Sequence, residues 1–166
     1  MRGVNRVKTI VITEGICITE EGKTVFNLLE MGIKPCCGCF GCWLTTPGRC
    51  RYKELDTFYH QYITADRTIY LVKVKKGFVS SDLKALWDRM LPLYLPYIWV
   101  KREGCTHVPR YDHYPDVALY YEGTFSTERE EEIFVDYVKR VFEQFSSKVM
   151  EVKPIAYYNE KEGAVR

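Results

Sequence analysis

The pattern of apolar and polar positions predicts two short strands near the start of the chain. Val7–Thr13 and Thr24–Leu29 are both rich in β-branched residues, which favour strands. The stretch between them is polar and too short for the helical crossover that usually joins parallel neighbours. If the two strands are neighbours, we therefore expect them to pair antiparallel, as a hairpin. The pattern leaves open whether Val7–Thr13 fills a central position in a sheet or lies at its edge.

Farther along the chain, the pattern alternates between helical and strand periods. A long loop is expected at Glu30–Lys53, because this stretch holds prolines and glycines and no regular apolar period. Apolar residues in Glu54–Ala65 repeat at helical spacing, and Thr68–Val74 is a nearly continuous apolar strand. The later elements are a helix capped by Ser80 or Ser81, a Pro-rich excursion at Pro92–Tyr114, a strand at Asp116–Tyr121, a helix after Thr127 and an edge strand at Val149–Tyr157.

The order of these elements predicts one α/β domain over residues 1–166, with a mostly parallel sheet covered on both faces. Ligands of such sheets bind beyond the carboxyl ends of the strands, so the loops after Leu29, Val74 and Tyr121 are expected to share one edge. The buried face of the helix after Thr127 is expected to comprise Ile133, Tyr137, Val138, Val141, Phe142 and Phe145.

Composition narrows the function classes. The 166 residues carry a net charge of +2 without a basic stripe, which argues against nucleic-acid binding. The most apolar run, Leu91–Val100, contains Pro92 and Pro96 and is about half the length of a membrane span. With no secretory pattern at the start, we expect a cytoplasmic protein without membrane contact. The sequence contains no acid pair, serine triad or complete phosphate loop, so it gives no basis for hydrolase or kinase chemistry.

Cysteine is the most informative residue type. The seven cysteines are Cys17, Cys36, Cys37, Cys39, Cys42, Cys50 and Cys105. Five of them fall between residues 36 and 50, and a tight, odd-numbered set indicates reduced thiols or a metal site. Cys36, Cys39, Cys42 and Cys50 have a spacing similar to that of iron–sulfur ligands, so a cluster or zinc is one interpretation. Two other interpretations of these cysteines are small thiols buried in a tight turn and exposed thiols of low pKa in a redox sensor.

The cysteine-rich stretch resembles a signature of a known family. Residues 33–50 read Ile-Lys-Pro-Cys-Cys-Gly-Cys-Phe-Gly-Cys-Trp-Leu-Thr-Thr-Pro-Gly-Arg-Cys, followed by acids Glu54 and Asp56. This is similar to flavodoxin-like NADPH-dependent FMN reductases, a group of NAD(P)H-dependent oxidoreductases, and to their iron–sulfur flavoprotein relatives. Gly77–Arg89 resembles the turn and helix after their third strand, and Pro109–Pro115 a further family segment.

The resemblance implies a flavodoxin-like three-layer fold, bound FMN, and hydride transfer from NAD(P)H to a small-molecule electron acceptor. An iron–sulfur cluster on the four cysteines is the less favoured cofactor. Relatives are often dimers, so a homodimer or larger homo-oligomer is expected, with the aromatic, Pro-containing run Leu91–Trp99 as interface or lid. The residues implied to contact the cofactor are Gly77, Val79, Ser80, Trp43 and Gly123.

The chain departs from the family in two places. The family's first strand leads into a phosphate-binding loop and helix, whereas Thr13–Thr19 offers one glycine and an acid. After the third strand, Val72–Gly77 carries Lys73, Lys75 and Lys76, which form either a solvated face or a charged ligand edge. Three functions stay open: an FMN-dependent oxidoreductase with impaired flavin binding, a binding or assembly subunit that has lost FMN, and a cysteine-loop metal or redox sensor.

Overall fold

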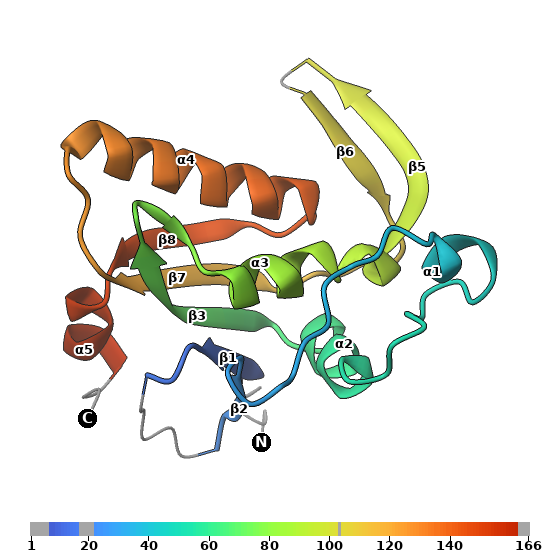
Figure 1. Cartoon of the computed structure of the whole chain (residues 1–166), viewed down its shortest axis with the longest axis horizontal. Coiled ribbons are helices and arrows are strands. Elements are labelled where there is room, and N and C mark those ends of the chain that lie inside the picture. Colours follow the sequence, from blue (N-terminus) through green and yellow to red (C-terminus); the bar gives the residue numbers. More distant parts are fainter. Residues whose placement is uncertain (1–6, 17–21, 103, 163–166) are drawn as a thin grey trace, which may run out of the picture.

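A mostly parallel sheet forms the centre of the molecule (Figure 1). The structure is a computed structural model that describes residues 7–16, 22–102 and 104–162. Five parallel strands pair in the order β2-β1-β3-β7-β8. They are β1 (Thr9–Thr13), β2 (Thr24–Asn27), β3 (Arg67–Lys75), β7 (Asp116–Glu122) and β8 (Val149–Pro154). Counted along the sheet this is the 2-1-3-4-5 order of a flavodoxin-like fold, which confirms the predicted fold class.

The antiparallel hairpin predicted for the first two strands is wrong. β1 lies in the centre of the sheet and runs parallel to both neighbours, with Val11 opposite Val25 on β2 and opposite Ile69 on β3. β2 has only four residues, about 13 Å of strand, and the ten residues 14–23 can extend over about 33 Å. The chain can therefore return to the start of a short parallel strand without a helix. Within this connection, none of the described residues 14–16 and 22–23 is helical.

The two faces of the sheet bury clusters of different size. Helices α2 (Asp56–Ile63), α3 (Ser81–Asp88) and α4 (Glu128–Gln144) bury the larger cluster, which includes Phe58, Trp87 and Phe142. The opposite cluster is small, and Tyr158 of α5 (Ala156–Glu162) packs there against Tyr120 of β7. Because α3 packs into the large cluster, it lies along the sheet. Its first residues are at the carboxyl edge of the strands and its last residues are toward the opposite edge (Figure 1).

The predicted helix starts at Ser80 and Thr127 are confirmed. The Ser80 hydroxyl accepts the N–H of Leu83, and the Thr127 hydroxyl accepts the N–H of Glu130. The buried face of α4 differs from the prediction, because Ile133 is 55% exposed whereas its neighbour Phe134 is buried. The residues of α4 and its C-cap that do lie in the core are Phe134, Val138, Phe142 and Phe145. Phe134 therefore takes the place of Ile133 on the buried face, whereas Tyr137 and Val141 pack partly buried against the core.

The Pro-rich excursion forms a hairpin that projects away from the sheet (Figure 1). After a 3-10 turn at Leu91–Leu93, β5 (Tyr94–Lys101) pairs antiparallel with β6 (Gly104–Pro109). Four consecutive residues of β5 are half or more exposed, namely Tyr97, Ile98, Trp99 and Val100. None of the helices in the described residues is long and apolar enough to cross a membrane.

A second short hairpin ends β3. The strand β4 (Phe78–Val79) folds back antiparallel through the turn at Lys76 and Gly77, with Lys75 opposite Phe78. Both turn residues have positive φ, 52° and 71°, which is the pattern of a two-residue type I′ turn. The lysines of this segment therefore lie on a tight hairpin at the end of β3. Lys73 Nζ lies 3.8 Å from a carboxylate oxygen of Glu122 on β7.

Candidate functional site

A buried carboxylate occupies the sheet edge where this class of fold binds ligands. Glu14 directly follows β1 and is only 3% exposed. Its Oε2 accepts a hydrogen bond from the backbone N–H of Lys73 at 2.6 Å, and its Oε1 accepts one from the Ser80 hydroxyl. Since Ser80 also caps α3, one carboxylate joins the ends of β1, β3 and α3.

The backbone donors after β1 are also in use. The N–H of Glu14 donates to the carbonyl of Leu71 at 3.0 Å. The N–H of Gly15 donates to Asn27 Oδ1 at 3.2 Å, and that of Ile16 donates to the hydroxyl of Thr13 at 3.0 Å. The remaining residues of the predicted first loop, 17–19, lie outside the described residues, as does Cys17.

These contacts do not fit the phosphate group of FMN. A phosphate at this edge needs free N–H groups or a helix N-terminus, and it gains from positive charge. In the described residues 14–16, each N–H already has an acceptor within the protein, and the side chain nearest the edge is an acid. The described part of the chain therefore supplies no phosphate cradle there.

Four of the five residues predicted to contact the cofactor gather at this edge. Gly77, Val79 and Ser80 follow β3, and Gly123 follows β7. Gly123 has a φ of 136°, and a Cβ there would lie 2.7 Å from the carbonyl oxygen of Val74. A glycine at this position is thus required for packing of β7 against β3, independently of any ligand.

Trp43 is separated from the other four. It lies on the short helix α1 (Gly41–Leu44), and its indole N–H donates to the carbonyls of Leu91 and Tyr94, at 3.2 and 3.0 Å. Those carbonyls follow the C-terminus of α3, whereas Ser80 caps its N-terminus. Trp43 and Ser80 are therefore at opposite ends of α3 (Figure 1). Trp43 anchors the cysteine-rich segment to the start of the hairpin β5–β6.

The second candidate region is the cysteine loop, residues 36–50, on the far side of α3. Cys36, Cys37, Cys39, Cys42 and Cys50 all line one small cavity of about 40 Å³. The rest of its wall is formed by Gly38, Phe40, Arg51, Tyr52, Arg89 and Leu91. In the described part of the chain, no group of three or more His, Cys, Asp or Glu side chains has the arrangement of a metal site. The four-cysteine metal site stays a prediction.

The surroundings within the loop shift the pKa values of its thiols in opposite directions. Hydrogen bonding from the backbone N–H of Gly41, then from the Cys37 thiol, and the nearby charge of Arg51 lower the pKa of Cys39 below its ordinary value. Burial raises the pKa of Cys42, and the neighbouring Cys50 and Cys36 thiols add to that effect. Lowered thiol pKa values favour the thiolate, which is the nucleophilic form.

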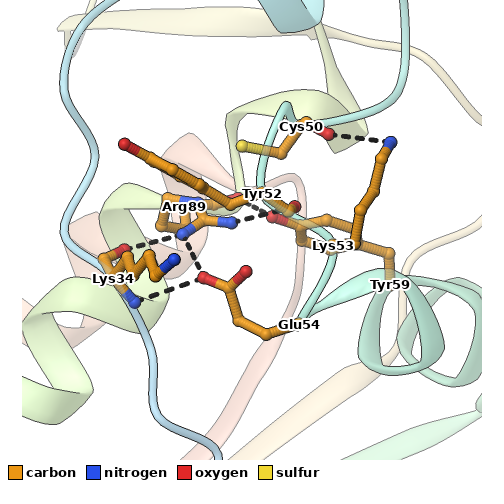
Figure 2. Close-up of polar contacts among 7 residues, drawn as sticks. All are labelled: Lys34, Cys50, Tyr52, Lys53, Glu54, Tyr59 and Arg89. Carbon is orange, nitrogen blue, oxygen red and sulfur yellow. Dashed lines mark hydrogen bonds and ion pairs between the residues drawn. The ribbon is translucent and has the colours of Figure 1, made fainter.

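One buried arginine ties the two ends of the cysteine loop together, as Figure 2 shows. The guanidinium of Arg89, with 1% of its side chain exposed, donates to the Lys34 carbonyl at 2.6 Å and to Glu54 Oε1 at 2.8 Å. It also donates to the Tyr52 carbonyl at 3.3 Å, and the guanidinium carbon lies 5.1 Å from the centre of the Tyr52 ring. Tyr59 of α2 donates in turn to the Arg89 carbonyl at 2.6 Å.

We call Arg89 and the three groups that it binds, Lys34, Tyr52 and Glu54, the Arg89 clamp. Burial alone raises the pKa of Glu54, but the hydrogen bonds from Arg89 and from the Lys34 backbone N–H outweigh burial and lower it. Burial opposes the charge of Arg89 as well, yet Glu54 holds its pKa above the ordinary value. Sequence reasoning did not identify the clamp, since the only available signal was an arginine at the end of an amphipathic helix.

Comparison with solved structures finds the same fold in other proteins. An azoreductase from Bacillus anthracis str. Sterne has a TM-score of 0.57 and 14% identity, over 93% of this chain and 90% of that chain. Azoreductase AzrA has a TM-score of 0.55 and 14% identity, over 92% and 90% of the two chains. Smu.1420 from Streptococcus mutans UA159 has a TM-score of 0.51 and 13% identity, over 90% and 89%. At these identities the likeness establishes the flavodoxin-like fold.

No protein-family model matches the sequence, and no curated protein matches it either. Function is therefore inferred from the arrangement of this chain's own residues.

Proposed function

We propose that this chain is a thiol-based redox protein on a flavodoxin-like fold, which works through its cysteine loop and does not retain FMN by itself. The observation that carries the proposal is the cavity that all five loop cysteines line. Two thiols that line one cavity can be oxidised as a pair when their sulfurs come into contact, giving up two electrons and two protons as a disulfide forms.

The Arg89 clamp supports this function because it fixes the loop at both ends. Two carbonyls and one carboxylate bind a single guanidinium, so the segment 34–54 has a defined closure although it contains little regular structure. A loop that is closed in this way keeps its thiols near one another instead of letting them spread over many conformations. The carboxylate of Glu14, which lies at the sheet edge and accepts hydrogen bonds there, supports the proposal that the chain does not retain FMN by itself.

The test is a redox titration of the reduced protein without added cofactor. The protein is equilibrated with mixtures of reduced and oxidised dithiothreitol, alkylated, and analysed peptide by peptide. We expect two of the loop cysteines to be oxidised together as one two-electron unit, whereas the exposed Cys105 outside the loop serves as the unpaired control. Loop thiols that stay reduced at every ratio, or that titrate independently, would count against the function.

A second candidate function is FMN-dependent oxidation of NAD(P)H. It is supported by the fold shared with two azoreductases, and by the gathering of Gly77, Val79, Ser80 and Gly123 at the carboxyl edge. Phosphate donors would then have to come from outside the described residues 14–16, for example from a second subunit. The electron acceptor would be a small molecule.

An absorption spectrum decides between the two candidates. The purified protein is soaked in FMN, passed through a gel-filtration column and measured. Two flavin bands that travel with the protein would favour the oxidoreductase, and a broad brown absorbance before soaking would indicate an iron–sulfur cluster on Cys36, Cys39, Cys42 and Cys50. A colourless protein with unpaired loop thiols would leave the third function, a binding or assembly subunit.

A further inference from the structure

An apolar pocket lies directly beside the cysteine loop. Its volume is about 420 Å³, and it lies between α3, α4 and the inner strand β6 of the hairpin. The lining residues are Trp87 and Leu91 from the α3 side, Tyr137, Val141 and Phe145 from the α4 side, and His107 from β6. Pockets of this size that are lined mainly by apolar side chains are the usual form of a small-molecule site.

The pocket rim carries charges that cancel. Lys84 and Asp88 of α3 form an ion pair with each other, so these two side chains add no net charge to the rim. The side-chain amide of Gln144 donates to the carbonyl of Cys105 on the hairpin. The walls therefore favour an uncharged ligand with an apolar body, and the partly exposed ring of Tyr137 suits a flat one.

One cysteine joins this pocket to the thiol cavity. Cys36 lines the apolar pocket, and it also lines the cavity shared by the other four loop cysteines. A ligand in the pocket would therefore meet the loop at Cys36 before any other thiol.

We propose that this pocket binds the oxidant of the cysteine loop, an uncharged organic disulfide with aromatic or otherwise apolar halves, and that Cys36 is the thiol that attacks it; the assignment rests on the proposed thiol function. Deprotonated Cys36 attacks one sulfur, the substrate S–S bond breaks, and one half leaves as a thiolate that takes a proton from water. A second loop thiolate then attacks Cys36 Sγ, and the other half leaves in the same way. One disulfide is reduced to two thiols, and two protein thiols become one disulfide.

The experiment compares two uncharged probes of different shape, 4,4′-dithiodipyridine and hydroxyethyl disulfide. Each rate with the reduced protein is divided by its rate with glutathione, which removes the intrinsic reactivity of the probe. We expect a normalised preference for the aromatic probe of about tenfold, since a ring seated in the pocket contributes binding energy of that order. The preference should disappear in Cys36→Ser and persist in Cys105→Ser.

A filling variant tests the pocket itself. Val141→Trp places a large side chain in the pocket and should abolish the preference, whereas Ile133→Trp, on an exposed part of the same helix, should preserve it. Equal thermal unfolding of the two variants shows that both fold. A preference that is absent from the wild type, or that survives Val141→Trp, overturns the inference while fast loop thiols keep the proposed function. Loop thiols no faster than Cys105 with either probe overturn both.

Discussion

The carboxylate of Glu14 accepts a hydrogen bond from the hydroxyl of Ser80, 66 positions later in the chain. The same carboxylate accepts the backbone N–H of Lys73, so a charged group at the end of the central strand holds the start of α3. A residue that appears in the sequence only as an obstacle to phosphate thus has a structural role of its own.

Replacement of Glu14 by alanine should lower the free energy of unfolding by about 1–3 kcal/mol, because buried donors at Lys73 and Ser80 lose their acceptor. Glu14→Gln keeps one acceptor oxygen and should cost less. Urea denaturation followed by circular dichroism measures both. Equal stability of the alanine variant and the wild type would show that the carboxylate is dispensable.

Replacement of Arg89 by methionine should lower the free energy of unfolding by about 3–5 kcal/mol, since Glu54 is left without its buried partner. The loop should also become open to proteases between residues 34 and 54. Arg129→Met is the matched control: its ion pair with Glu132 is exposed, so the cost should stay below about 1 kcal/mol. Similar losses in both variants, or intact resistance of the loop, would contradict the role of the clamp.

The clamp also predicts acid sensitivity. The folded-state pKa of Glu54 lies below its ordinary value of 4.5, so the ionised carboxylate stabilises the folded state above that pH. This contribution should be lost as the pH falls through the lowered pKa. Urea midpoints measured from pH 7 to pH 3 should therefore fall less steeply at the acid end in Glu54→Gln. Parallel profiles for the two proteins would mean that Glu54 does not take part.

Gly123→Ala should lower the free energy of unfolding by about 1–3 kcal/mol from backbone strain, with a further loss from the contact with the Val74 carbonyl. Gly104→Ala, on the hairpin, is a close control, since its φ is 144° and a Cβ there would meet no described atom within 4 Å. Thermal melts of the two variants separate strain from contact. Equal losses at both positions would show that the close approach of β7 to β3 carries no cost.

The homodimer that the sequence predicts can be tested on the exposed face of β5. Val100 is 82% exposed, and Val100→Glu should lower the molar mass in light scattering if this face forms the contact. Leu44→Glu, at a residue 79% exposed on α1, should leave the mass unchanged. A wild-type protein that is monomeric at all concentrations would contradict the predicted homodimer.

The features that could be predicted from the sequence are those that depend on residues close together in the chain. The apolar runs within β3 and β7 predicted buried parallel strands, because both faces of such strands are covered. Ser80 and Thr127 predicted helix starts, because a cap needs only an N–H three residues away. On α4, local spacing found the helix and most of its buried face, but it placed Ile133 there instead of Phe134, a choice that only packing distinguishes.

Features that depend on contacts between distant parts of the chain became visible only in the folded molecule. The direction of β2 follows from its pairing with β1, which a short connection leaves open. Trp43 and Gly77 are separated by α3, although both lie in segments that resemble one family. The burial of Arg89 depends on carbonyls from Lys34 and Tyr52, and the acceptor for Ser80 comes from Glu14. These hydrogen-bond partners are brought together by the packing of the whole core. The spacing of residues along the chain does not tell which distant residues will lie close together in space.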